Sequence, residues 1–529
     1  MHTFATAVRD LRRLLVAAIV FAPRLVAQNP SATAAKAGPI IRTSDGAVQG
    51  IALPSGVRAF RGIPFAAPPV RQLRWQPPQP AAHWQGVRLA DRFANQCMQA
   101  RVFSDMMFRN SGVSEDCLYL NVWVPAKARA GSGFPVLVYF FGGGFVAGDG
   151  SEFRYDGESL ARRGIVVVTT SYRLGIFGFF SHPELTAESP RHTSGNYGLM
   201  DQAAALRWVR ANAAAFGGDP QRVTIAGESA GSMSVSAQMA SPLARGLFAR
   251  AIGESGALFS SSGPMPTLAQ TEQNGTRFAE ATGAPSLAAL RALSASELLE
   301  RSARQGVPRF GPNVDGYFFP QPPAQIYAEG RQAHVPLLAG WNSEESSWRG
   351  LTRQSTPDSA RAVLARMFGE RAADAEPYYP AQDSAQAAQS LTELASDRFI
   401  AYSTWKWLDV HAATSGQPVY RYYFARPRPG AQGAVHSAEI EYALGNLATN
   451  NVYTWTPDDE KVSSIMESYF ANFITSGDPN GAGLPVWPLG TIGTNGEVQR
   501  LRIDVEPRAE AEPRARYRFL DQVFANARP

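Results

Sequence analysis

The stretch Gly227-Glu228-Ser229-Ala230-Gly231 constrains the fold of this chain most strongly. It follows the apolar run 222–226 and precedes residues 232–239, so the order predicts a buried strand, a tight turn and the start of a helix. Glycines two residues before and after the serine allow a sharp turn and a close approach of neighbouring segments. Such a turn holds the serine hydroxyl at the top of a sheet, and the positive end of the following helix faces it. We therefore interpret Ser229 as a nucleophile.

The central part of the chain alternates between two hydrophobic periods. Residues 135–141 and 164–171 are continuous apolar runs, whereas 196–216 has helical spacing, and a further strand is expected at 222–226. Continuous apolar strands that alternate with helices indicate a mostly parallel sheet covered on both faces. The predicted fold class is α/β.

Other elements are expected on either side of this region. We expect hairpins at 40–62, an irregular proline-rich segment at 64–80, strands at 118–125, 335–340 and 419–425, and helices at 267–281, 286–302, 360–368 and 459–475. The helices at 267–281, 286–302 and 360–368 resemble an insertion that could cap the sheet. We treat residues 40–529 as a single domain, because large α/β folds often remain whole.

The charge of the chain and the spacing of its histidines and cysteines argue against nucleic-acid binding and against a metal site. The net charge is only +5, from 50 basic and 45 acidic residues, and the basic residues are scattered singly. Nucleic-acid binding is therefore not expected. The seven histidines lie far apart with neither HxxxH nor CxxC spacing, so no metal site is expected.

The N-terminus resembles an export signal. Basic residues precede a nine-residue apolar stretch, 14–22, and Ala27 offers a small residue at a cleavage point. Nine apolar residues are too few to span a bilayer. We expect a signal peptide at 1–27, a linker at 28–39 and a secreted or periplasmic protein. In an exported chain Cys97 and Cys117 most simply form a disulfide, whereas in a cytosolic chain both would be free.

His436 is the best candidate for the base that a serine nucleophile needs. The ordinary pKa of a histidine side chain suits proton transfer near neutral pH. It lies in a glycine-rich loop after the expected strand 419–425, where open α/β sheets place their sites. The other six histidines lie in the signal, in loops, before a strand or on a helix face, where ordinary structural roles account for them.

The acid that orients the histidine should lie between the serine and the histidine in the chain. Glu344 and Glu345 directly follow the expected strand 335–340, and spacing alone does not choose between them. The oxyanion needs backbone N–H donors, which Gly143 and Gly144 after the strand 135–141, together with Ala230, can supply.

Together these stretches resemble the type-B carboxylesterases, the α/β-hydrolase family that includes cholinesterases, liver carboxylesterases and bacterial nitrobenzyl esterases. The most specific match is Ser114-Glu115-Asp116-Cys117-Leu118-Tyr119-Leu120-Asn121-Val122. The other matching stretches are 60–66, 141–145, 195–202, 216–220, 227–231, 340–345 and 435–436.

The resemblance implies an α/β-hydrolase fold with helical cap insertions and a serine carboxylesterase that needs no cofactor. Carried over by motif, the catalytic residues are Ser229, Glu345 and His436, the oxyanion donors are Gly143, Gly144 and Ala230, the disulfide is Cys97–Cys117, and the ion pairs are Arg74–Glu115 and Arg173–Asp201. The expected partner is a small-molecule ester. A lipase or amidase of the same fold and a non-catalytic adhesion or binding protein are the alternatives, and a monomer and a homodimer both stay open.

The chain departs from the family pattern at several positions. Phe141 stands where relatives often have His or Tyr, and Ser346 and Ser437 follow the acid and the histidine, the latter where glycine is usual. Between Cys97 and Cys117 there is no tryptophan. Cholinesterases hold a quaternary ammonium over a tryptophan from this loop, so a choline ester is not the expected substrate.

We predict that a choline ester is hydrolysed no faster than the ester of an uncharged alcohol of similar size. The substrates are expected to be esters of short to medium acyl chains. Comparison of kcat/KM for butyrylcholine and 3,3-dimethylbutyl butyrate tests this. A tenfold preference for the choline ester, about 1.4 kcal/mol, would show that another aromatic side chain forms a cation site.

Overall fold

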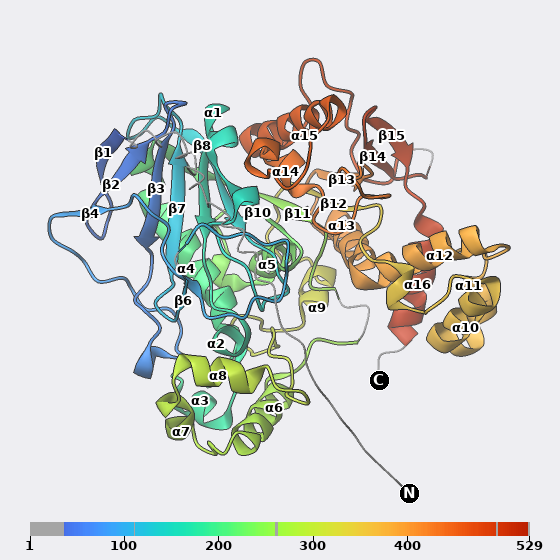
Figure 1. Cartoon of the computed structure of the whole chain (residues 1–529), viewed down its shortest axis with the longest axis horizontal. Coiled ribbons are helices and arrows are strands. Elements are labelled where there is room, and N and C mark those ends of the chain that lie inside the picture. The colour runs from blue at the N-terminus through green and yellow to red at the C-terminus, as the bar shows by residue number, and fades with distance from the viewer. Residues whose placement is uncertain (1–35, 111, 260–262, 494–495, 527–529) are drawn as a thin grey trace, which may run out of the picture. The chain divides into compact units, whose positions relative to one another are not determined.

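Among the described residues, thirteen of the fifteen strands form one sheet that organises the fold, and the other two pair with each other (Figure 1). The computed structural model describes residues 36–110, 112–259, 263–493 and 496–526. The expected signal peptide and residues 28–35 of the expected linker lie outside the described residues. The strands are β1 Lys36–Arg42, β2 Ala47–Ala52, β3 Arg58–Pro64, β4 Val87–Leu89, β5 Gln96–Cys97, β6 Val113–Ser114, β7 Tyr119–Val124, β8 Phe134–Phe140, β9 Val166–Thr170, β10 Gly218–Glu228, β11 Arg250–Glu254, β12 Leu337–Asn342, β13 Val419–Phe424, β14 Gln499–Ile503 and β15 Arg508–Ala511.

The centre of the sheet is parallel, as predicted. Its order is β1-β2-β3-β7-β9-β8-β10-β11-β12-β13-β14-β15, with β4 beside β2. All six pairings from β9 to β14 are parallel, and those from β1 to β9 and between β14 and β15 are antiparallel. Parallel strands end at the same edge, so the carboxyl ends of β8, β10, β11, β12 and β13 lie next to one another.

Helices cover both faces of the sheet. Consecutive residues of β13 show this directly, because strand side chains alternate between faces. Tyr420 and Tyr422 pack against Phe473 and Phe470 of α15, whereas Arg421 pairs with Asp409 of α13 at 3.0 Å. The helices are α1 Glu158–Arg162, α2 Gly175–Phe179, α3 Pro183–Glu188, α4 Tyr197–Asn212, α5 Ala230–Ala240, α6 Leu268–Ala281, α7 Leu287–Ala292, α8 Ala295–Ser302, α9 Pro323–Ala328, α10 Pro357–Phe368, α11 Ala372–Ala375, α12 Ser384–Ser396, α13 Tyr402–Thr414, α14 Ile440–Ala443, α15 Pro457–Ser476 and α16 Arg514–Asn526.

Two sequence predictions of element boundaries are wrong. The predicted helix 286–302 consists of α7 and α8, because the side chain of Ser294 accepts the N–H of Glu297 and begins a new helix with a capping box. Residues 36–39, predicted as linker, belong to β1, which pairs with β2. Helices α6, α7 and α8 lie together at one end of Figure 1, beside α3.

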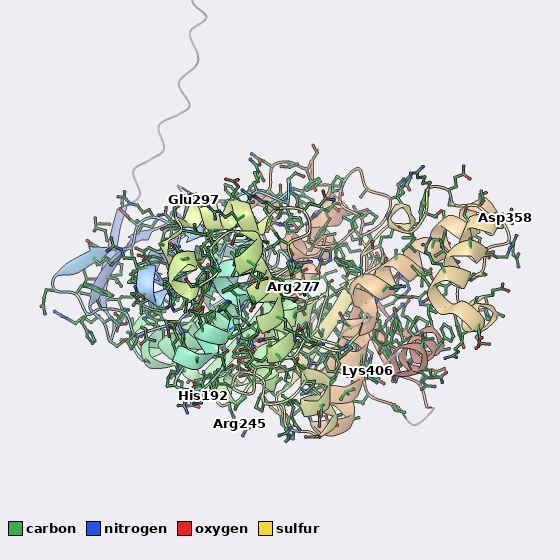
Figure 2. The ribbon with its side chains drawn as sticks, turned by 90° about the horizontal axis from the view of Figure 1, so that it is seen from below. His192, Arg245, Arg277, Glu297, Asp358 and Lys406 are labelled. Atoms are coloured by element: carbon green, nitrogen blue, oxygen red, sulfur yellow. A yellow bond between two sulfur atoms is a disulfide. The ribbon has the colours of Figure 1, made fainter. Side chains whose placement is uncertain are left out.

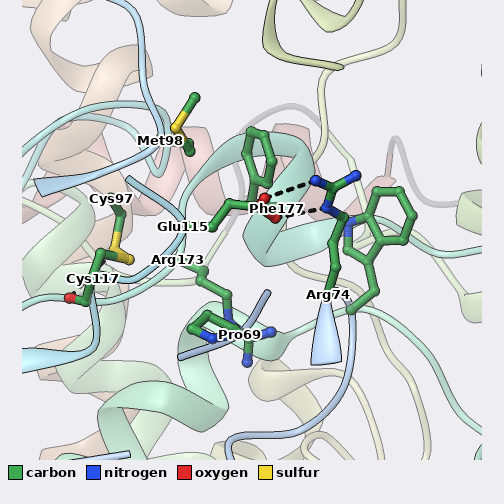
Figure 3. A pocket seen from close by; sticks show the side chains of 9 residues that line it. Pro69, Arg74, Cys97, Met98, Glu115, Cys117, Arg173 and Phe177 are labelled. Carbon is green, nitrogen blue, oxygen red and sulfur yellow. Dashed lines mark hydrogen bonds and ion pairs between the residues drawn. A yellow bond between two sulfur atoms is a disulfide. The ribbon is translucent and has the colours of Figure 1, made fainter. Parts of the chain in front are cut away.

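Covalent and ionic links that the resemblance implies are present near the start of α2. Cys97 and Cys117 are bonded to each other. Arg74 binds Glu115 through two hydrogen bonds of 2.6 and 2.7 Å, and both line a small pocket beside the disulfide (Figure 3). Arg173 binds Asp201 at 2.8 and 2.7 Å, and both side chains are buried.

Exposed charges contribute less to the fold than these buried links. Arg277, Glu297 and Asp358 are exposed side chains on the outer helices (Figure 2). The pair Asp358–Arg361 is typical, because water screens both of its partners. Removal of one partner of a buried pair should cost more than breaking an exposed pair, because it leaves an uncompensated buried charge.

We predict that the double substitution of Cys97 and Cys117 by Ala lowers the free energy of unfolding by about 3 kcal/mol, because the bond closes a loop of 20 residues. Denaturant titration of the oxidised and substituted proteins measures the difference. Substitution of Met107 by Leu, inside the same loop, serves as a control and should leave the midpoint unchanged. An unfolding free energy within 0.5 kcal/mol of the original would contradict the prediction.

Candidate active site

Ser229 lies at a strained elbow between β10 and α5. Its backbone has φ 56° and ψ −119°, which is unusual for a residue with a side chain. The Ser229 N–H donates to the carbonyl oxygen of Glu254 at the end of β11 (2.8 Å). A Cβ on Gly231 would lie 2.0 Å from the carbonyl oxygen of Phe140. The predicted turn is therefore present, and only glycine fits at position 231.

The structure brings Ser229, Glu345 and His436 together. Nε2 of His436 lies 3.0 Å from Oγ of Ser229, and Nδ1 lies 2.6 Å from Oε2 of Glu345. Ser229 follows β10, Glu345 follows β12 and His436 lies in the loop after β13. The three side chains thus meet because their strands end at the same edge of the sheet.

The geometry distinguishes the two glutamates that the sequence left open. The carboxylate of Glu345 is fully buried, and besides His436 it accepts the backbone N–H of Asn342 (2.6 Å) and the hydroxyl of Ser255 (2.5 Å). The carboxylate of Glu344 points elsewhere and occupies the space beside Gly433, where a Cβ would lie 2.1 Å from its Cδ. Of these two glutamates, Glu345 is the one that contacts the histidine.

The glycine run lies directly against the serine. A Cβ on Gly142 would lie 3.2 Å from Cβ of Ser229. Gly143 and Gly144 have φ of 105° and 62°, which favours glycine at both positions. Within the described part of the chain, no protein group accepts their N–H groups. Ala230 is fully buried at the first turn of α5, so three backbone N–H groups are available beside Ser229.

Further carboxylates surround the histidine, and sequence analysis did not find them. Oε1 of Glu228 lies 3.2 Å from Nε2 of His436. Glu439 accepts the side-chain N–H of Asn342 (2.6 Å), and the hydroxyl of Ser255 reaches it at 3.3 Å. Burial raises the pKa of Glu228 to about 8 and that of Glu439 to about 7. The sequence analysis named Glu228 only as a residue of the turn around Ser229 and predicted no contact between it and His436.

The charge of these carboxylates determines the protonation of His436. Burial lowers the pKa of this histidine, but the nearby charges of Glu228 and Glu345 outweigh it and raise the pKa to about 9. The side chain is 27% exposed. A protonated imidazole cannot accept a proton. Because its pKa is raised, His436 stops acting as a base at a higher pH, as the pH is lowered, than an ordinary histidine does.

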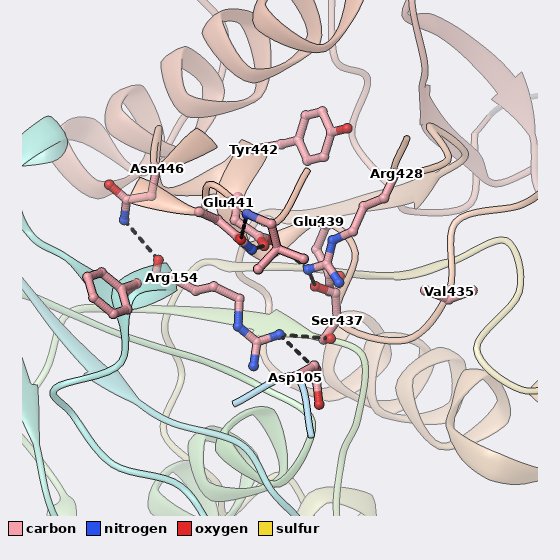
Figure 4. Close-up of polar contacts among 12 residues, drawn as sticks. Asp105, Arg154, Arg428, Val435, Ser437, Glu439, Glu441, Tyr442 and Asn446 are labelled. Carbon is pink, nitrogen blue, oxygen red and sulfur yellow. Dashed lines mark hydrogen bonds and ion pairs between the residues drawn. The ribbon is translucent and has the colours of Figure 1, made fainter. Parts of the chain in front are cut away.

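A buried polar network supports the loop that carries His436 (Figure 4). Arg154 donates to the hydroxyl of Ser437 at 3.1 Å and reaches Asp105 of the disulfide loop at 3.4 Å. Arg428 binds the carbonyl of Ser437 and the carboxylate of Glu441. Ser437 has φ 66°, a conformation that explains why glycine is usual there.

The described residues include no helix that is both long and apolar enough to span a bilayer. No group of His, Cys, Asp and Glu side chains among these residues has the arrangement of a metal site.

Comparison with known proteins gives one consistent result. The family model "Carboxylesterase family" matches residues 37–520. The chain is 38% identical to a fumonisin B1 esterase of Sphingopyxis macrogoltabida over 465 residues, which is 84% of this chain and 83% of that protein. It is 35% identical to an acylcarnitine hydrolase of Mus musculus over 515 residues, 89% of this chain and 88% of that one.

Solved structures agree with this result. A carboxylesterase of Geobacillus stearothermophilus superposes with a TM-score of 0.79 at 32% identity, covering 91% of this chain and 99% of that chain. A PNB esterase superposes with a TM-score of 0.78, also at 32% identity and with the same coverage.

We predict that Glu228→Gln lowers the pKa of His436, because it removes a negative charge 3.2 Å from Nε2. The pH dependence of the rate at which a fluorophosphonate labels the protein reports this pKa. In the original protein the rate should fall below an apparent pKa higher than 6.5, and in the variant this fall should occur at lower pH. Glu344→Gln, which removes a carboxylate that forms no ion pair with His436, is the control. An unchanged or higher apparent pKa in Glu228→Gln would contradict the prediction.

Proposed function

The chain belongs to the carboxylesterase family and is a serine ester hydrolase, and we propose that Ser229 is its nucleophile, His436 its general base and Glu345 the acid that orients the histidine. The contact of 3.0 Å between Nε2 and Oγ carries this proposal, because a serine hydroxyl reacts only when a base removes its proton. The fold is that of an α/β-hydrolase.

Acylation begins when Nε2 of His436 accepts the proton of the Ser229 hydroxyl as Oγ attacks the ester carbonyl carbon. The carbonyl oxygen gains the negative charge, and the N–H groups of Gly143, Gly144 and Ala230 donate to it. The tetrahedral intermediate collapses with cleavage of the bond to the alcohol oxygen. His436 gives its proton to that oxygen, and the alcohol leaves the acyl group on Ser229.

Deacylation repeats these steps with water. His436 takes a proton from the water molecule, whose oxygen attacks the acyl carbon, and then returns a proton to Oγ of Ser229 as the acid leaves. The chemistry requires no cofactor. The complete set of hydroxyl, imidazole, carboxylate and backbone donors supports an enzyme rather than a non-catalytic binding protein of the same family.

Export of the protein is a further part of the proposal. A disulfide between Cys97 and Cys117 is the kind of link that persists outside the cytosol. Together with the signal pattern in residues 1–27, it favours a secreted or periplasmic enzyme.

We predict that Glu345→Gln lowers kcat by about 10⁴ with little change in KM, because the variant leaves the histidine badly oriented and its imidazolium unsupported. Steady-state kinetics with 4-nitrophenyl butyrate measures both constants. Ser229→Ala should abolish the hydrolysis.

The matched control is Glu344→Gln, which changes the adjacent residue and should stay within about tenfold of the original kcat, since it removes no contact with His436. Circular dichroism and thermal melts establish that both variants are folded. If Glu344→Gln were the inactive variant and Glu345→Gln the active one, the assignment of the acid would be wrong.

A further inference from the structure

An arginine that follows helices α6, α7 and α8 of the cap insertion contacts the glycine run, residues 142–144. Arg309 follows α8, and its Nη2 donates to the carbonyl oxygen of Gly144 at 2.6 Å. A Cβ on Gly144 would lie 2.7 Å from the same nitrogen. The guanidinium therefore covers the face of the residue whose N–H we assign to the oxyanion.

This guanidinium has spare hydrogen-bonding capacity and an unbalanced charge. It carries five N–H donors, and the carbonyl of Gly144 is its one hydrogen-bond acceptor in the described part of the chain. Among the described residues no carboxylate forms an ion pair with Arg309, which is exposed. Arg154 and Arg428, which contact Ser437 beside His436, are buried and pair with carboxylates. Arg309 differs from them in offering a positive charge to a ligand.

The neighbouring residue fixes the position of Arg309. Phe310 is buried, and its ring packs against those of Phe180 (5.6 Å) and Phe278 of α6 (5.4 Å). This anchor and the bond to Gly144 hold the guanidinium in place before any ligand binds. A pre-positioned guanidinium loses little conformational entropy when it binds a carboxylate with two parallel hydrogen bonds.

The roles proposed for His436 and Gly144 indicate whether the acyl part or the alcohol part of an ester lies near the Arg309 guanidinium. The alcohol oxygen receives its proton from Nε2 of His436, so the alcohol lies on the side of the histidine. The ring of Phe399, which is 50% exposed, borders that side 4.9 Å from the imidazole. The acyl group extends away from His436, and Gly144 with Arg309 lies beside the carbonyl carbon.

We propose that Arg309 binds a carboxylate on the acyl part of the substrate, and that the enzyme therefore prefers monoesters of dicarboxylic acids to neutral esters of the same length. This rests on the function proposed above, because it places the acyl group by the roles of His436 and Gly144. The competing interpretation is that Arg309 only fastens the cap insertion to the glycine run.

The first experiment uses the unmodified protein. We expect kcat/KM for ethyl hydrogen glutarate to exceed that for ethyl pentanoate about tenfold, with the succinate and adipate monoesters establishing the best length. Increasing NaCl from 0.05 to 0.5 M should reduce this ratio, because the guanidinium is exposed and salt screens it. A ratio of one or less for all three monoesters would overturn the proposal.

The second experiment changes Arg309. Arg309→Gln should reduce the ratio about tenfold, Arg309→Lys should retain part of it, and the exposed control Arg304→Gln, whose arginine pairs with Glu300, should keep it. If Arg309→Gln slows both esters equally and leaves the ratio unchanged, Arg309 only fastens the cap, and the proposal is wrong.

A pair with the carboxylate on the alcohol, 4-acetoxybutyrate and pentyl acetate, tests the placement. A preference that depends on Arg309 for this pair alone would overturn the assignment to the acyl side. Hydrolysis of neutral esters without any anionic preference would overturn this inference and leave the proposed function intact. Absence of hydrolysis of every ester would overturn both.

Discussion

The arrangement of the site depends on the contact between the start of α5 and the end of β8. A Cβ on Gly231 would lie 2.0 Å, and one on Gly227 2.5 Å, from the carbonyl oxygen of Phe140. Because Phe140 leads into residues 142–144, this contact also helps to place Ser229 relative to Gly143 and Gly144, which we propose as donors to the oxyanion. The strained φ of 56° at Ser229 persists because β8 and β11 pair with β10 directly before it and the Ser229 N–H itself donates to Glu254 at the end of β11.

The second constraint is the burial of several carboxylates around one imidazole. Buried charge is costly unless hydrogen bonds or opposite charges compensate it. Glu345 accepts three hydrogen bonds, which hold its carboxylate and the plane of the histidine ring in place. Burial and the charges of Glu439 and Glu228 raise the pKa of Glu254 well above its ordinary value. Of these buried carboxylates, Glu228 and Glu345 lie against His436.

Sequence reasoning located the residues that follow strands and missed those placed by tertiary contacts. Ser229, His436 and the glycine run carry local signals, namely small residues at a turn and a loop after an apolar strand. Glu439 carries none, because it becomes part of the site only through Asn342 and Ser255. His411 was expected on a helix face, but the bounds of helix α13 were not predicted, because both of its sides are buried, with Trp405, Trp407 and His411 in the core, and it lacks an amphipathic period. The break within 286–302 depends on the cap at Ser294, which the helical spacing of the apolar residues obscures.

The strands and the insertions thus make separate contributions. The groups that we propose to react follow β10, β12 and β13 of the parallel part of the sheet, whose pairing fixes their separations. The side chains next to them come from other segments. Met106 belongs to the disulfide loop, and its Cε lies 3.1 Å from where a Cβ on Gly143 would be. Arg309 follows α8 of the cap insertion, and Phe399 belongs to the π-helix η7 Asp397–Ala401. A substitution among these side chains changes the surface that an ester meets and leaves the sheet unaltered. Selectivity can therefore diverge among proteins of this fold while the serine, histidine and carboxylate keep the same geometry, since no bond within the triad passes through the insertions.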